Sequence, residues 1–253
     1  MEGYVRSNKE DGLAVIEFFH PKSNSMPSSQ LALLAKSIEE AGADPGVKLI
    51  LIKSGGDKAF CAGANFDELL SISNEEEGRS FFMGFAHVIN AMRKAPQLIV
   101  CRVQGKCVGG GVGIASAADY TLATNDAEIK LSELAVGLGP FVVGPAVERK
   151  LGLSAFSQMT IQAGQFQPAE WAREKGLFME IYSSLQELDE AVKKLTDSLL
   201  QSNPEATTAL KKVFWEGSSD WDNLLQERAE ISGRLVLSEY TRNWIKNFKS
   251  RPN

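Results

Sequence analysis

The run of small residues at positions 109–113, Gly-Gly-Gly-Val-Gly, constrains the fold more than any other feature of this chain. It stands between the apolar segment 98–103, which is typical of a buried strand, and the apolar segment 114–118. We expect a helix to begin within the run, because the first N–H groups of a helix lack intrahelical acceptors and carry positive partial charge. Glycine lets an anionic oxygen approach such groups closely. The run predicts an oxyanion site, although a tight turn that only packs a helix against a strand gives the same pattern.

Two further segments share this character. Residues 58–67, Lys-Ala-Phe-Cys-Ala-Gly-Ala-Asn-Phe-Asp, follow an expected strand at 47–53 and again lead from small residues into a helix. Residues 131–140, Leu-Ser-Glu-Leu-Ala-Val-Gly-Leu-Gly-Pro, place the single carboxylate of Glu133 among apolar neighbours. A carboxylate in apolar surroundings is costly, so it requires a structural or chemical reason.

The composition excludes several classes of protein. With 253 residues, 43% hydrophobic and 23% charged, the chain is long enough for one sizeable core and an appendage. A net charge of −5 argues against nucleic acid as a partner, because phosphate binding normally requires a basic field. No apolar run is long enough to span a bilayer, and the first eleven residues are polar rather than signal-like. We therefore expect a cytoplasmic protein that contacts neither nucleic acid nor a membrane.

The cysteines predict neither a disulfide framework nor a metal site. Cys61, Cys101 and Cys107 are odd in number, lie in separate apolar settings and lack the spacing of metal ligands. We expect all three to be reduced. Cys61 lies beside an expected oxyanion segment, but neither His20 nor His87 is near it in sequence, so we interpret it as a small buried residue rather than a nucleophile.

The order of the expected elements indicates stacked layers rather than an open doubly wound sheet. A hairpin is expected first, with its turn between residues 9 and 12, and then a helix capped by Ser28 or Ser29. Further strands are expected at 47–53, 98–103, 120–123 and 180–182, and helices at 80–94, 110–118, 185–201, 204–215 and 222–247. The last three helices carry more aromatic residues than they can bury, which favours contact with a neighbouring subunit.

Taken in order, AFCAGA, GKCVGGGVGIASAAD and LSELAVGLGP resemble the enoyl-CoA hydratase/isomerase (crotonase) family over nearly the whole chain. The resemblance implies an α/β spiral of repeated ββα units with a C-terminal helical region that forms oligomers. Residues 1–195 would form the core with the CoA-binding and active sites, and residues 196–253 the oligomerisation region of a homotrimer or dimer of trimers. No prosthetic group or metal is implied, and coenzyme A enters as part of the acyl-CoA substrate.

The resemblance also assigns site residues. The N–H groups of Ala64 and Gly110 would hold the thioester oxygen as it becomes an enolate, and Glu133 would be the acid/base. Contacts to coenzyme A are implied at Ala62 and Ala64. Lys22 and Lys58 are candidates for its phosphates.

One departure bears on the reaction. Hydratases of the family carry a second glutamate four residues after the first glycine of the GGG run, and this chain has Gly113 there. We expect glycine to leave room where that glutamate would lie. The combination of GGGVG with LSELAVGLGPFVVGP resembles a branch of methylglutaconyl-CoA hydratases of leucine breakdown, so hydration of a branched or carboxylated 2-enoyl-CoA is the first expectation. A Δ3,Δ2-enoyl-CoA isomerase, a decarboxylase of a methylglutaconyl thioester and a CoA-binding scaffold without catalysis are the alternatives.

Other polar residues near these motifs are expected to be structural. Asp119 is interpreted as a cap or turn residue, and Asp67 and Glu68 as residues that face solvent.

Overall fold

The chain begins with the expected hairpin. In the computed structural model, which describes residues 2–249, β1 (Tyr4–Glu10) pairs antiparallel with β2 (Leu13–Phe19). The turn between them is formed by Asp11 at φ 49° and Gly12 at φ 88°. Positive φ at both central residues is the geometry of a two-residue hairpin turn, which an Asp-Gly pair readily adopts. The hairpin prediction is confirmed.

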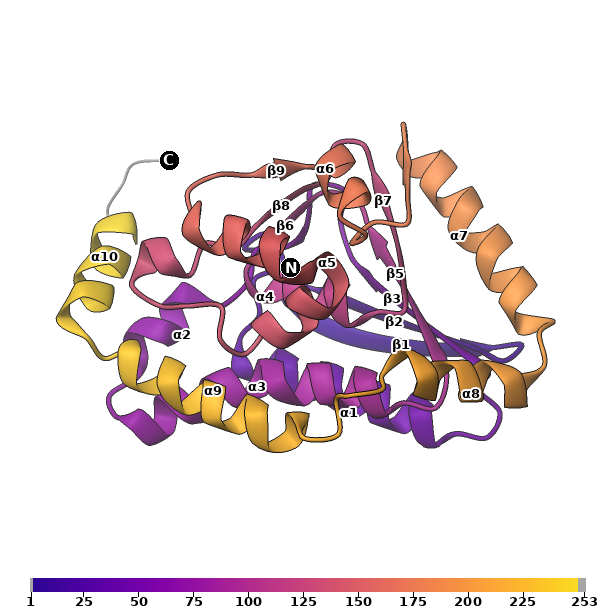
Figure 1. The fold of residues 1–253 in the computed structure, drawn as a ribbon, viewed down its shortest axis with the longest axis horizontal. Helices are drawn as coiled ribbons and strands as arrows, with labels where there is room; N and C mark the ends of the chain where they lie inside the picture. Colours follow the sequence, from indigo (N-terminus) through magenta and orange to yellow (C-terminus); the bar gives the residue numbers. More distant parts are fainter. Residues whose placement is uncertain (1, 250–253) are drawn as a thin grey trace.

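The hairpin continues into a six-stranded sheet in the order β1-β2-β3-β5-β7-β10 (Figure 1). Its further strands are β3 (Leu49–Ser54), β5 (Leu98–Val103), β7 (Tyr120–Thr124) and β10 (Glu180–Tyr182). All pairs after the hairpin are parallel. Both faces of this sheet are covered by helices, which is why its inner strands read as continuous apolar runs.

A second sheet of four short strands has the order β4-β6-β8-β9. Its strands are β4 (Ala59–Cys61), β6 (Lys106–Val108), β8 (Glu128–Lys130) and β9 (Gln167–Pro168). β4, β6 and β8 each follow a strand of the larger sheet along the chain, and each is followed by a helix. The expected repetition of ββα units is confirmed.

Helices cover the two faces of the larger sheet differently. α7 (Leu185–Leu200) packs Leu188 and Val192 onto Leu49 and Leu51 in a small outer core. The alternate residues Ile50 and Ile52 face the main core instead. That core also contains α1 (Ser28–Ala43) and α3 (Glu75–Lys94), and α9 (Trp221–Leu235) packs along α3 (Figure 1).

The expected cap of α1 is corrected by the structure. Pro27 is the residue before the helix, and no serine side chain caps it. The Ser28 N–H instead donates to Glu68 Oε2 at 2.8 Å. A carboxylate from α2 (Phe66–Ser71) therefore satisfies the start of α1, so Glu68 does not simply face solvent.

The remaining helices complete the chain. They are α4 (Gly110–Ala117), the short 3-10 helix η1 (Leu134–Val136), α5 (Gly144–Ile161), α6 (Ala169–Glu174), α8 (Pro204–Phe214) and α10 (Glu239–Lys249). The single helix expected at 222–247 is wrong, because α9 and α10 are separate. Ser238 Oγ accepts the Thr241 N–H at 3.3 Å, which caps a new helix at that point.

Asp119 has the expected structural role. Its carboxylate accepts the Ile99 N–H at 2.7 Å, Lys211 Nζ at 2.7 Å and Trp215 Nε1 at 3.0 Å. Both Lys211 and Asp119 are buried in this ion pair. Through Asp119, these contacts hold α8 against the start of β5.

The aromatic residues of the C-terminal helices are only partly buried. Trp215 and Trp221 pack edge to face in the core, at a centroid separation of 5.6 Å. Phe214, Tyr240 and Phe248 remain 46%, 64% and 44% exposed. The division of the chain after residue 195 stays a prediction, and that position lies inside α7. Within residues 2–249, no helix combines the length and apolar character needed to cross a membrane.

Candidate active site

Three neighbouring strand ends define the site. β4, β6 and β8 are parallel neighbours in the smaller sheet, so their carboxyl ends lie at one edge. Ala64 follows β4, Gly110 follows β6 and Glu133 follows β8. Residues from motifs far apart in the sequence therefore meet in one pocket, which all three of these residues line.

The N–H group of Ala64 points away from Met26, the residue with which Ala64 pairs. Ala64 forms an isolated parallel bridge with Met26, in which the Met26 N–H donates to Gly63 O at 2.8 Å and the Asn65 N–H donates to Met26 O at 3.3 Å. In a parallel pairing, the residue between those two bonds directs its own N–H to the opposite side. The next residue, Asn65, caps α2 by accepting from the N–H groups of Asp67 and Glu68.

The second N–H group belongs to the first residue of α4. Gly109, at φ 53°, donates its own N–H to Lys130 O at 2.8 Å and turns the chain into the helix. Phe85 packs so closely on Gly110 that an added Cβ would lie 2.1 Å from its ring, so only glycine fits. Neither Ala64 nor Gly110 uses its N–H in the turn, loop and cap hydrogen bonds of residues 2–249.

Glu133 supplies the carboxylate of the pocket. Its Oε2 is buried and has no hydrogen-bond partner among the described residues. Burial raises the pKa of Glu133 to about 7. The carboxylate lies against the start of α4, where a Cβ added at Gly109 would be 2.9 Å from Oε1. An acid that exchanges its proton near neutrality thus stands beside two free N–H groups.

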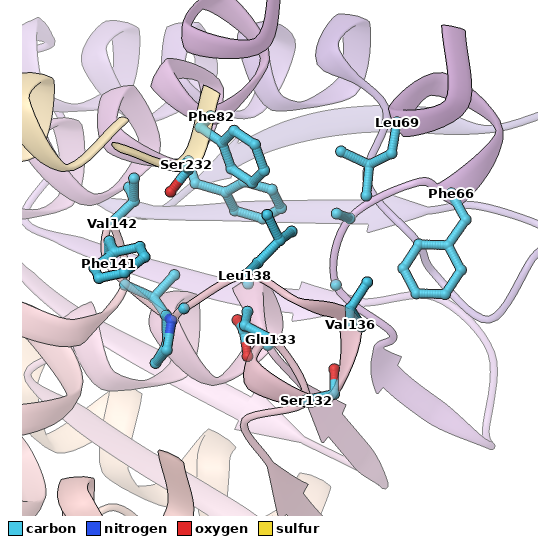
Figure 2. A pocket seen from close by; sticks show the side chains of 18 of the residues that line it. Phe66, Leu69, Phe82, Ser132, Glu133, Val136, Leu138, Phe141, Val142 and Ser232 are labelled. Carbon is cyan, nitrogen blue, oxygen red and sulfur yellow. The ribbon is translucent and has the colours of Figure 1, made fainter. Parts of the chain in front are cut away.

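The inner pocket is small and mostly apolar. It encloses about 60 Å³, and Figure 2 shows its side chains. Besides Glu133, its polar side chains are Ser132 and Ser232. The apolar side chains of the lining include Phe66, Leu69, Phe82, Phe85, Val136, Leu138, Phe141, Val142 and Val143.

A larger cleft of about 840 Å³ adjoins this pocket and shares Ala62 and Ala64 with it. Lys22 lines the cleft and forms an ion pair with Asp67. Lys58 lies outside the lining of both cavities, so the structure does not bring it to the site. Lys130 lines the cleft instead. Lys130 was not among the residues expected from the sequence, although its position at the end of β8, three residues before Glu133, is a signal that could have indicated it.

The space expected beside Gly113 does not exist. A Cβ added at Gly113 would lie 2.5 Å from Val143 Cγ1 and 2.7 Å from Val143 Cβ. The Val143 side chain, from the residue before α5, fills the position where a glutamate side chain would begin. The expectation of room at this position is therefore wrong.

The three cysteines lie in apolar surroundings, away from water. Cys61, Cys101 and Cys107 are free and buried, and burial raises the pKa of the Cys61 thiol to about 12. A thiol with so high a pKa is a poor nucleophile at neutral pH. Within the described part of the chain, no cluster of three or more His, Cys, Asp or Glu side chains is arranged to hold a metal ion.

Comparison with known proteins identifies the family. The profile of the enoyl-CoA hydratase/isomerase family matches residues 8–242. This chain belongs to the enoyl-CoA hydratase/isomerase family. Enzymes of this family act on CoA thioesters, and the expected crotonase fold and enzyme class are confirmed.

Relatives in the family carry different activities. Human mitochondrial methylglutaconyl-CoA hydratase is 28% identical over 189 residues, which cover 74% of this chain and 55% of the human protein. The chain thus matches just over half of that relative. The peroxisomal Δ(3,5)-Δ(2,4)-dienoyl-CoA isomerase of Arabidopsis thaliana is 28% identical over 235 residues, covering 85% of this chain and 83% of the isomerase.

Solved structures share the fold. The crystal structure of enoyl-CoA hydratase from Bacillus halodurans superposes with a TM-score of 0.88, covers 96% of this chain and 99% of its own, and is 20% identical. At that identity the likeness establishes the fold alone.

Proposed function

We propose that this chain catalyses proton transfer on an acyl-CoA thioester, with Glu133 as its acid/base and the N–H groups of Ala64 and Gly110 as the donors to the thioester oxygen. Two converging N–H groups in a dry pocket stabilise an enolate oxygen without requiring a titratable residue, and one such donor contributes about a hundred- to a thousandfold in rate. The two free N–H groups beside a buried carboxylate support this assignment.

The reaction that this geometry supports best is migration of a double bond from the 3- to the 2-position. The Glu133 carboxylate takes a proton from Cα of a 3-enoyl thioester, and the electron pair of the C–H bond moves toward the thioester oxygen. The same carboxyl group then returns the proton to Cγ, which leaves the conjugated 2-enoyl thioester. This sequence requires one acid/base group and no water.

One observation carries this preference: Glu133 is the single titratable side chain of the inner pocket among the described residues. A hydratase divides two tasks between carboxylates, because one polarises the water and the other delivers a proton. At position 113, Val143 leaves no space for a second carboxylate.

Hydration is the second candidate, supported by the name of the human relative. A branched 2-enoyl group suits the apolar lining. A carboxylated one, whether hydrated or decarboxylated, would enter a pocket with no lysine or arginine among the lining residues that the structure describes. Such a substrate would have to place its carboxylate toward Lys22 or Lys130 in the adjoining cleft.

That cleft is the proposed site for the rest of coenzyme A. Its volume, its cations Lys22 and Lys130, and its apolar lining at Ala62 suit an apolar arm that ends in phosphates. A homotrimer or dimer of trimers is part of the proposal, supported by the exposed aromatic side chains of Phe214 and Tyr240.

A substrate panel separates the candidates. The purified protein is incubated with a 3-enoyl-CoA, crotonyl-CoA and 3-methylglutaconyl-CoA, and the absorbance of the conjugated thioester is followed. A gain with the 3-enoyl-CoA indicates bond migration, and a loss with either of the others indicates hydration. Release of CO2 from 3-methylglutaconyl-CoA, measured separately, indicates decarboxylation, because protonation of the dienolate at Cγ leaves a conjugated thioester. Neither a change in absorbance nor release of CO2, despite measurable binding, would support a scaffold without catalysis. Glu133→Gln, which keeps the size but cannot exchange the proton, must abolish whichever activity is found.

A further inference from the structure

The inner pocket contains a hydroxyl group that the proposed proton transfer does not use. Ser232 is 1% exposed and lines the pocket, although it comes from α9, about 100 residues after Glu133 in the chain. Figure 2 shows it beside Phe141 and Val142, whereas Glu133 lies toward Ser132 and Val136. Ser132 lines both cavities and so lies where the inner pocket meets the larger cleft. Ser232 lines only the inner pocket.

The close crossing of α9 and α3 brings Ser232 to the inner pocket. Its neighbour Gly233 meets Gly78 of α3, where a Cβ added at position 78 would lie 2.7 Å from Gly233 O. A Cβ added at Gly233 would lie 2.5 Å from the N atom of Arg79. The two backbones are therefore in contact, which lets a side chain as short as serine reach the pocket.

The hydrogen bond of Ser232 determines what it offers a ligand. Its hydroxyl donates to Arg228 O at 3.1 Å, one turn earlier in α9. A hydroxyl has one donor and two acceptor sites, so the lone pairs of Oγ remain available. A group that donates a hydrogen bond can bind there without breaking the existing one.

We propose that Ser232 is a specificity-determining residue that selects acyl groups with a neutral hydrogen-bond donor, such as a hydroxyl, on the part of the chain remote from the thioester. This inference rests on the proposed function, in which the acyl group enters the inner pocket. A charged substituent is disfavoured, because the described residues of the lining include no lysine or arginine and Glu133 is the one ionisable side chain among them.

Binding of unreactive ligands tests the inference apart from catalysis. Dissociation constants are measured by calorimetry for hexanoyl-CoA, its 4-, 5- and 6-hydroxy derivatives and adipoyl-CoA, with the wild type and with Ser232→Ala. We expect at least one hydroxy derivative to bind the wild type more tightly than hexanoyl-CoA does. Ser232→Ala should weaken that derivative about three- to tenfold relative to hexanoyl-CoA.

The matched control is Ser218→Ala. Ser218 is also buried and also donates to a backbone carbonyl, Trp215 O at 2.6 Å, but it does not line either cavity of the site. It should leave the ratio between hydroxylated and unsubstituted ligands unchanged. Thermal unfolding of both variants shows whether each remains folded.

Each outcome bears on one claim. If Ser232→Ala changes the dissociation constants of hexanoyl-CoA and of its hydroxy derivatives equally, the inference is overturned. The Ser232 hydroxyl would then serve only its hydrogen bond within α9. Tighter binding of adipoyl-CoA than of every hydroxy derivative would overturn the preference for a neutral group. Absence of turnover in the substrate panel, with the Ser232-dependent ratio intact, would overturn the proposed function and leave this inference standing.

Discussion

The side chain of Val143 packs directly on Gly113, with its Cγ1 2.5 Å from where a Cβ at that position would lie. Gly113 therefore leaves no empty space where a glutamate side chain could lie, because the side chain of Val143, at the start of α5, fills it. A glutamate cannot be restored there by changing one residue.

Gly113→Glu alone is expected to destabilise the protein without creating hydration of crotonyl-CoA. Forcing a side chain into a packed core costs typically about 1–3 kcal/mol. Gly113→Glu combined with Val143→Ala should recover part of the loss, because it removes the Cγ1 methyl group at 2.5 Å, whereas the Cβ at 2.7 Å remains in alanine. Urea unfolding of both variants and of Val143→Ala alone provides the measurement. Equal stability of Gly113→Glu and the wild type would show that the Val143 side chain can move aside at little cost in free energy.

The rate of bond migration should rise with pH through about 7. Glu133 must be ionised to take the proton from Cα, and burial raises its pKa to about 7. A profile of kcat/KM against pH in the free enzyme should show one acidic limb near that value. A limb near 4.5, the ordinary value for a glutamate, would place Glu133 in a solvated environment.

Glu133→Gln should stabilise the fold, and more so at pH 8 than at pH 5. Because the folded-state pKa lies above the unfolded value, the wild type loses stability as pH rises from about 4.5 to 7, where the folded protein retains a proton that the unfolded chain has released. At 1.36 kcal/mol per pKa unit, the advantage of the variant should grow by about 2 kcal/mol between the two pH values. Urea unfolding of both proteins at each pH measures it, and a constant difference would contradict the raised pKa.

Ala64→Pro should remove one oxyanion donor while keeping the bridge to Met26. The two backbone bonds of that bridge use the N–H groups of Met26 and Asn65, and proline at position 64 removes neither donor. Turnover should fall about a hundred- to a thousandfold with acyl-CoA binding largely retained. A folded variant with full activity would exclude Ala64 as a donor.

Gly78→Ala should weaken the contact of α9 with α3. The new Cβ would lie 2.8 Å from Gly233 Cα, a backbone atom that cannot rotate away. We expect a lower melting temperature even though alanine favours the helix by about 1 kcal/mol. Gly42→Ala in α1 is the control, since its nearest neighbours would be at 3.7 Å, and it should be neutral or stabilising.

The sequence named Ala64, Gly110 and Glu133 as site residues through the resemblance of three motifs to one family. It did not predict the short strands β4, β6 and β8 that precede these residues. Because β4, β6 and β8 are parallel neighbours, their carboxyl ends lie at one edge of the smaller sheet, and this arrangement brings the three motifs together.

The parts that the sequence did not predict depend on contacts between distant segments. Val143 meets Gly113 thirty residues earlier, and Glu68 replaces the expected serine cap of α1 forty residues before it. Ser232 enters the pocket only through the crossing of α3 and α9. No periodicity or local composition encodes these pairings, because each is set by how completed elements pack.

The contact between Gly78 and Gly233 has a consequence for how this pocket can diverge. The distance between α9 and α3 beside the acyl pocket is set by the contact of the main chains at Gly78 and Gly233. It therefore does not depend on the identity of the side chains around these two glycines. A lineage can then exchange Ser232 for another small residue and alter which acyl chain is accepted while the dimensions of the cavity stay constant. The two glycines set the width of the pocket, and Ser232 sets its hydrogen-bonding chemistry. Either property can therefore change in evolution while the other stays the same.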